Sequence, residues 1–147
     1  MRFMIIVRST PEFEAETRPD PDPAVLAEMA RYHEELAAAG VLLDGNGLRP
    51  SRDGWRIAYG RDGVRVVDGP FAETKELIAG YTLIDVRSRD EALAWSRRFP
   101  NPVGAGRDAL VEVRQLYELD DFTPGDEIER MKRIEASRRA DDTAGRR

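Results

Sequence analysis

Two short segments of this chain are apolar at nearly every position, and they constrain the fold more than any other feature. Residues 3–7 are apolar throughout, and residues 81–86 are interrupted only by Thr82 and Asp85. Because successive side chains of a strand point to opposite faces, a strand that is apolar on both faces belongs in the centre of a sheet. Residues 109–117 carry charge on one face only, which is typical of an edge strand. We therefore expect the first and third main strands to be central.

Two segments that follow these central strands are expected to be helical. In residues 23–39 an apolar side chain recurs at helical spacing, and Asp22 can cap the first turn. Residues 88–98 begin with a capping-box pair, Ser88 and Glu91. With a short second strand after the first helix, the order is β-α-β-β-α-β. This order predicts an α+β fold of the ferredoxin-like type, an antiparallel sheet with two helices on one face.

Additional elements are expected between and after these. Residues 55–59 and 64–67 flank a glycine-bounded turn, which predicts an extra β-hairpin. Residues 10–22 hold three prolines and are expected to form a loop. A narrow apolar stripe from about residue 124 to 138 predicts a C-terminal helix, followed by a frayed end.

The expected organisation is one domain at residues 1–120 and a helical tail at residues 121–147. The two helices of the domain would cover one face of the sheet and leave the other face apolar and uncovered. A second subunit is the simplest cover, so we expect a homodimer. An arginine at a central position such as Ile5 should then unfold or dissociate the protein.

Composition excludes several classes of function. The net charge of −5 argues against direct binding of nucleic acid through a basic surface. The chain has no cysteine and a single histidine, which excludes disulfides, thiolate sites and histidine-cluster metal sites. We expect no metal and no cofactor. The apolar run at the N-terminus is too short for a signal peptide or a membrane span, so a cytoplasmic location is expected.

Four blocks of sequence together resemble a known family. They read DGPFAETKELIAGYTLIDV (68–86), YHEELAAAGVLLDGNGLRPS (32–51), EALAWSRRFPNP (91–102) and VEVRQLYE (111–118). In this order they resemble the DGPF-motif proteins, a branch of the YCII-related domain family. The resemblance covers roughly residues 1–120. It implies a ferredoxin-like dimeric α/β-barrel fold and a link to sigma-factor-dependent transcription, with a protein partner favoured over DNA by the acidic charge.

The turn that carries the DGPF motif is expected to be structural first. Gly69 can adopt a positive φ and Pro70 has a fixed φ, so the chain should reverse sharply after the strand. Asp68 can accept hydrogen bonds from backbone N–H groups of that turn. Replacing Gly69 by valine should be destabilising if its φ is positive.

Three residues are candidates for acid–base chemistry. His33 lies at the border of the buried face of the first helix, and the resemblance implies a His–Asp pair with the histidine on that helix. Asp44 and Asp68 follow strands beside glycines and are its candidate partners. The alternatives remain open: His33 bonded to a neighbour such as Glu34 or to a backbone carbonyl, and the two aspartates bonded to turn amides.

Three further residues are candidates for binding a ligand. Arg49 and Lys75 could hold an anionic small molecule, and Tyr81 could line its cleft. Three hypotheses for function follow. We favour a dimeric, non-catalytic binding or regulatory module. The alternatives are a small-molecule enzyme with its cleft between the first helix and the sheet, and a dimer without retained chemistry.

Overall fold

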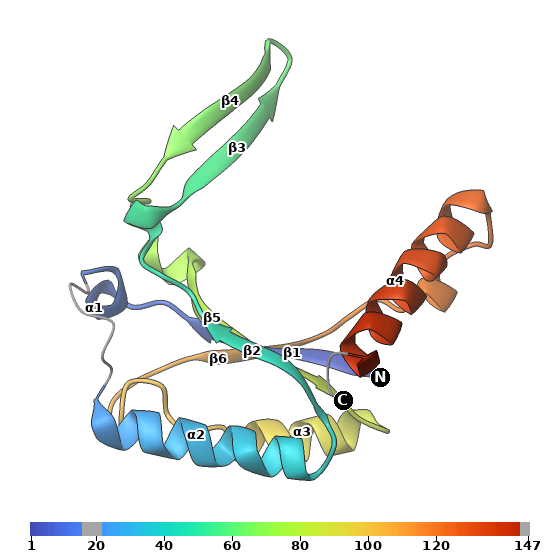
Figure 1. Cartoon of the computed structure of the whole chain (residues 1–147). Helices are drawn as coiled ribbons and strands as arrows, with labels where there is room; N and C mark the ends of the chain where they lie inside the picture. Colours follow the sequence, from blue (N-terminus) through green and yellow to red (C-terminus); the bar gives the residue numbers. More distant parts are fainter. Residues whose placement is uncertain (16–21, 145–147) are drawn as a thin grey trace. The chain divides into compact units, whose positions relative to one another are not determined.

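The computed structural model describes residues 1–15 and 22–144 (Figure 1). These fall into two compact units, Met1–Gln115 and Leu116–Arg147, which are described separately. The first unit contains β1 (Arg2–Arg8), α1 (Pro11–Glu14), α2 (Pro23–Ala38), β2 (Leu42–Gly47), η1 (Ser51–Asp53), β3 (Trp55–Gly60), β4 (Gly63–Asp68), η2 (Thr74–Glu76), β5 (Ile78–Asp85), α3 (Arg89–Arg97) and β6 (Val111–Gln115). The second contains η3 (Leu119–Asp121) and α4 (Asp126–Ala144).

Four strands form an antiparallel sheet in the order β2-β5-β1-β6. The prediction that the first and third main strands are central is confirmed, because β1 and β5 pair with each other and each has a second neighbour. The last strand lies at an edge, as its one-sided charge predicts. The chain therefore has a mixed α+β fold built on an antiparallel sheet.

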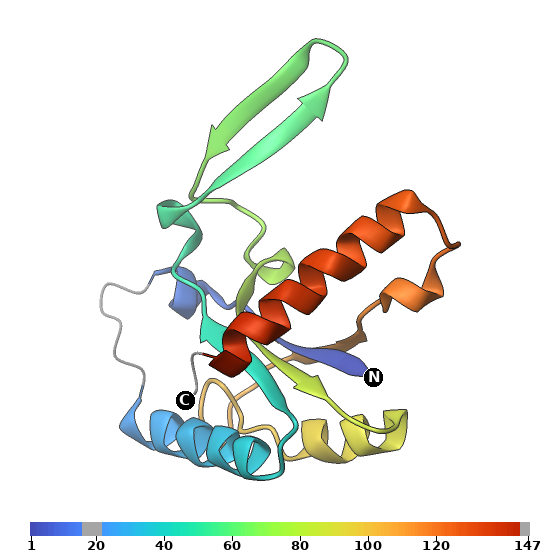
Figure 2. The same ribbon diagram turned by 45° about the vertical axis from the view of Figure 1, so that its right-hand side comes forward.

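Helices α2 and α3 lie on the same face of this sheet (Figures 1 and 2). The core between them and the sheet is centred on Ile5, Leu36 and Ile84, which are fully inaccessible to solvent. Tyr32 of α2 is 4% exposed, and its hydroxyl donates a hydrogen bond to the carbonyl of Trp95 at 3.0 Å. Burial raises the pKa of Tyr32 to about 12. The phenol is thus held neutral inside the core.

The opposite face of the sheet carries a second set of apolar side chains. Met4 and Ile6 of β1 lie beside Leu83 and Tyr81 of β5, and all four are half-buried. We call these four residues the open face. Ile5 points the other way, toward the helices, because side chains alternate along a strand. A substitution at Ile5 therefore tests the core, and one at Ile6 tests the open face.

Strands β3 and β4 form a separate two-stranded sheet, so the predicted hairpin is confirmed. The hairpin rises on the side of the main sheet that is opposite to α2 and α3 (Figures 1 and 2). Its register is regular from Trp55, which pairs with Asp68, to Gly60, which pairs with Gly63.

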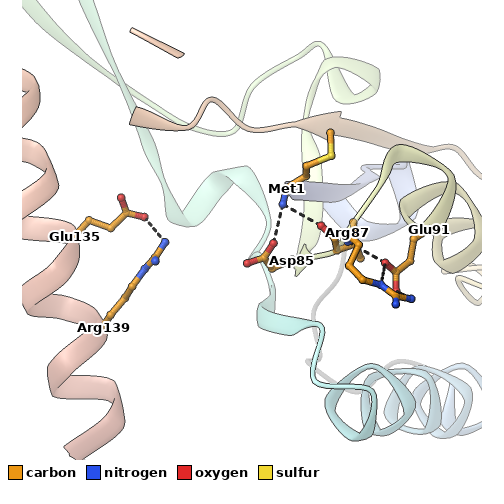
Figure 3. Close-up of polar contacts among 7 residues, drawn as sticks. Met1, Asp85, Arg87, Glu91, Glu135 and Arg139 are labelled. Carbon is orange, nitrogen blue, oxygen red and sulfur yellow. Dashed lines mark hydrogen bonds and ion pairs between the residues drawn. The ribbon is translucent and has the colours of Figure 1, made fainter. Parts of the chain in front are cut away.

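The predicted helix starts are confirmed by their caps. The Asp22 carboxylate accepts a hydrogen bond from the Ala24 N–H at 2.9 Å, and the Ser88 hydroxyl accepts one from the Glu91 N–H at 3.1 Å. The Glu91 carboxylate does not complete a capping box with Ser88. It instead accepts from the backbone N–H and the guanidinium of Arg87 (Figure 3). These hydrogen bonds lower the pKa of Glu91.

One expectation about an irregular segment needs correction. The segment 10–22 is not a loop throughout, because Pro11–Glu14 forms one helical turn that Thr10 caps by accepting from the Phe13 N–H at 3.3 Å. Residues 16–21 of that expected loop lie outside the described part.

The C-terminal helix α4 extends beyond its predicted end near residue 138. An ion pair between Glu135 and Arg139, one turn apart at 2.9 Å, supports the extension (Figure 3). The last part of the expected frayed end, residues 145–147, lies outside the described residues. Within residues 1–15 and 22–144, the structure has no helix both long and apolar enough to span a membrane.

Candidate ligand-binding pocket

A pocket of about 760 Å³ opens between α2 and the part of the sheet where β2 pairs with β5. Its apolar wall consists of Val7, Phe13, Val25, Leu26, Met29, Ala30, Leu48, Pro50, Ala79, Phe99 and Pro102. The polar residues that line it are His33, Asn46, Arg49, Arg52, Asp53, Tyr81 and Thr82. A concave, mostly apolar site with a few polar groups is the usual form of a small-molecule site.

His33 is held by both ring nitrogens. Its Nδ1 lies 2.8 Å from the carbonyl oxygen of Met29, one turn earlier in α2, and its Nε2 lies 2.9 Å from the hydroxyl of Thr82. A carbonyl can only accept, so Nδ1 carries the hydrogen in the neutral ring and Nε2 accepts from the hydroxyl. The expected alternative, a histidine bonded to a backbone carbonyl, is therefore the arrangement found.

Thr82 and Gly45 explain why the imidazole fits at this point. Thr82 is 2% exposed and is directed to the helix side of β5, where a polar group needs a partner. Gly45 lies opposite Thr82 on β2, and a Cβ at Gly45 would come within 3.0 Å of the Nε2 of His33. The lack of a side chain at Gly45 therefore leaves room for the ring.

Asp44 has partners other than His33. Its carboxylate accepts from the hydroxyl of Tyr81 at 2.8 Å, from the backbone N–H of Gly45 at 2.8 Å and from the amide of Asn46 at 3.1 Å. Asp44 does bond a neighbouring backbone N–H, as expected, but Gly45 belongs to strand β2 and not to a turn.

A β-bulge explains why Asp44 and His33 are separated. The register shifts by one residue after Leu42, so Asp44 pairs with Leu83 and points to the open face of the sheet. His33 contacts the other face through Thr82. The structure therefore does not bring this candidate acid–base pair together.

The remaining predicted residues divide between the pocket and its surroundings. Arg49 lines the pocket, and its Nε pairs with Asp53 at 2.9 Å while its side chain is 85% exposed. Tyr81 also lines it. Asp68 and Lys75 do not line the pocket, and both are exposed. Among residues 1–15 and 22–144 there is no group of three or more His, Cys, Asp or Glu residues that could hold a metal ion.

Comparison with known sequences identifies the family. The sequence model of the YCII-related domain family matches residues 1–120. The chain belongs to this family. An uncharacterized protein of Rhizobium meliloti is 35% identical over 80 residues, which is 54% of this chain and 64% of that protein. This YCII-related chain thus belongs to a family whose function is uncharacterized.

In this YCII-related chain the DGPF segment fixes the base of the hairpin. The N–H of Phe71 donates to the hydroxyl of Ser51 at 3.0 Å, and the same hydroxyl donates to the carboxylate of Glu14. The guanidinium of Arg56 lies over the ring of Phe71 at 3.9 Å. Pro50 and Arg52, the two neighbours of Ser51 in the sequence, line the pocket. The hydrogen bond from Phe71 to Ser51 therefore helps to hold this part of the pocket wall in place.

The reason for glycine in this motif differs from the expected one. The φ of Gly69 is not positive, so the strained-turn explanation is wrong. A Cβ at Gly69 would instead lie 1.8 Å from the carbonyl oxygen of Ser51, where no side chain can fit. Asp68 forms no side-chain hydrogen bond to the turn in the described part of the chain, contrary to expectation.

Sequence reasoning missed two polar residues of this YCII-related structure, Thr82 and Glu14. A signal was present for Thr82, because it interrupts an otherwise apolar central strand and such a residue requires a buried partner. Glu14 gave no comparable signal. Its partner, Ser51, lies 37 residues away in the sequence.

Proposed function

We propose that this chain is a dimeric, non-catalytic binding module that takes a small, mostly apolar molecule with an acidic group. The observation that carries this proposal is the 760 Å³ pocket, whose volume suits a small ligand and whose wall is largely apolar. Arg49 and Arg52 lie along the same pocket and would favour an anionic group.

The hydrogen bonds of His33 favour binding over catalysis. Met29 and Thr82 hold both ring nitrogens, and these partners are neutral. A His–Asp acid–base pair needs a carboxylate at one of the two ring nitrogens, and here the Met29 carbonyl and the Thr82 hydroxyl lie at these positions. The imidazole and the hydroxyl are better suited to orient the polar end of a ligand. The enzyme hypothesis remains the alternative because His33 does line the pocket.

The assembly that we propose is a ferredoxin-like dimeric α/β barrel, in which the open face of one sheet lies against that of a second copy. Its support is the set of apolar side chains on this face, Met4, Ile6, Tyr81 and Leu83, on strands that are central in the sheet. The resemblance to DGPF-motif proteins adds the proposal of a regulatory role linked to sigma factors. We also propose that the chain belongs to the DGPF-motif branch of the family and that it is located in the cytoplasm.

Titration with octanoate, followed by NMR, tests the pocket. Octanoate has an apolar chain and one carboxylate, and 1-octanol is its uncharged counterpart. We expect octanoate to shift the resonances of His33 and Thr82 and to bind more tightly than 1-octanol. Arg49→Gln should weaken octanoate binding by roughly threefold to tenfold and leave 1-octanol unaffected. Lys75→Gln is the matched control, because it removes a similar charge outside the pocket.

Two results would contradict the proposed ligand class. One is the absence of any octanoate-dependent shift at His33 and Thr82. The other is an equal loss of octanoate affinity in Arg49→Gln and Lys75→Gln, which would indicate attraction by overall charge rather than a site.

A further inference from the structure

One face of the β3–β4 hairpin is apolar along almost its whole length. In an antiparallel pair, residues that lie opposite each other point to the same side. The register therefore places five apolar side chains on one face of the hairpin: Trp55, Ile57, Tyr59, Val64 and Val66. Asp68 lies at the end of the same face, opposite Trp55. They are 65%, 42%, 81%, 64% and 61% exposed, respectively. We call these five residues the arm face.

The arm face is too large and too exposed for an isolated ribbon. An aromatic side chain alone offers roughly 150–250 Å², so the five residues together expose on the order of 600 Å². Soluble monomers rarely expose contiguous apolar patches above a few hundred Å² unless the patch is an interaction site. A two-stranded hairpin is also only marginally stable by itself in water. Both arguments indicate that another surface covers the arm face.

The base of the hairpin is fixed by contacts with α1 and η1. Ser51 links Phe71 to Glu14, and the N–H of Gly69 donates to the carbonyl of Gly54 at 2.9 Å. The hairpin rises on the side of the sheet that carries the open face and away from α2 and α3 (Figure 2). A copy of the chain seated on the open face would therefore lie on the same side as the arm.

We propose that the arm face packs against a second copy of this chain, the one that covers the open face. Two arms related by a two-fold axis would bury on the order of 1,200 Å² of arm surface, which reaches the lower end of stable protein interfaces. On this side of the hairpin the charged residue is Asp68, at the end of the arm face, so little charge would be buried. This inference rests on the proposed dimer, to which it adds a second contact region.

The fluorescence of Trp55 tests the contact directly. The chain has two tryptophans, so Trp95→Phe leaves Trp55 as the only tryptophan, which is excited selectively at wavelengths that tyrosine does not absorb. Its emission and its quenching by acrylamide are measured over a dilution series, with sedimentation at the same concentrations. We expect blue-shifted emission and several-fold weaker quenching where the protein is dimeric. Both should revert on dilution to the monomer.

A matched pair of substitutions, made with Trp95 intact, gives an independent measurement. Tyr59 lies on the arm face and Val67 on the other face of the same hairpin. We expect Tyr59→Ser to weaken dimerisation at least tenfold and Val67→Ser to change it less than twofold.

The outcomes separate this inference from the proposed dimer. A dimer in which Trp55 stays exposed and Tyr59→Ser has no effect would overturn the arm contact alone. A protein that is monomeric at every concentration would overturn the dimer and the arm contact together. Equal shielding of Trp55 in monomer and dimer would place the cover within the same chain and would also overturn the inference.

Discussion

Gly69→Ala is the sharpest test of how the DGPF segment is held. The new Cβ would lie 1.8 Å from the carbonyl oxygen of Ser51, whereas real Cβ contacts are almost never shorter than 3.0 Å. The turn and η1 must therefore move apart by more than about 1 Å, since backbone atoms cannot rotate out of the way. Such a shift would break the contacts that the segment makes.

The expected loss follows from these contacts. The Gly69 N–H bond to Gly54 and the Phe71 N–H bond to Ser51 contribute about 1 kcal/mol each. The contact between Arg56 and Phe71 adds about 0.5–1 kcal/mol. Together we expect a loss of about 2–3 kcal/mol, which lowers the Tm of a chain of this size by about 5–10 °C.

Gly54→Ala is the matched control, because its Cβ would lie 3.7 Å from the same oxygen of Ser51. This distance is an ordinary contact, so we expect a change below about 1 kcal/mol. Thermal unfolding of both variants, together with amide exchange at Phe71, makes the comparison. If Gly69→Ala and Gly54→Ala unfold at the same temperature with equal protection at Phe71, the close-approach explanation is wrong.

Two further substitutions test the core and the open face. Tyr32→Phe should cost about 1 kcal/mol near pH 8, because the hydrogen bond to Trp95 is lost. Since folding raises the pKa of Tyr32 from 10.0 to about 12, the unfolded chain ionises first and the tyrosine's stabilising contribution is lost between these values. Urea unfolding should therefore show that wild type loses about 1.4 kcal/mol relative to Tyr32→Phe between pH 8 and pH 11, so that the variant becomes slightly the more stable of the two. A difference that stays constant with pH would contradict the buried neutral phenol. Ile6→Arg should leave a monomer that is folded by circular dichroism, whereas Ile5→Arg should unfold the chain because it buries an unpaired charge in the core. If sedimentation shows that Ile6→Arg is still a dimer, the open face is not the interface.

Local sequence patterns determined much of this fold. The apolar character of residues 3–7 and 81–86 identified the central strands, because burial on both faces is a property of the segment itself. Asp22 and Ser88 also marked the helix starts through a local property, because a capping side chain accepts from an N–H group two or three residues away. The hairpin was also predictable from its own turn.

The polar contacts in and beside the candidate pocket depended on tertiary structure. His33 and Thr82 are 49 residues apart, and Asp44 and Tyr81 are 37 apart, so no local pattern could pair them. Simple alternation after Leu42 would have turned Asp44 toward the helix side, where His33 lies. The one-residue bulge turned it to the open face instead.

The sequence by itself thus determined the two central strands, the two helices that cover them and the hairpin, because these features depend on neighbours within a few residues. The tertiary structure alone decided which polar groups meet and why Gly69 must lack a side chain. These depend on the register between distant strands, and a shift of one residue reverses the face to which a side chain points.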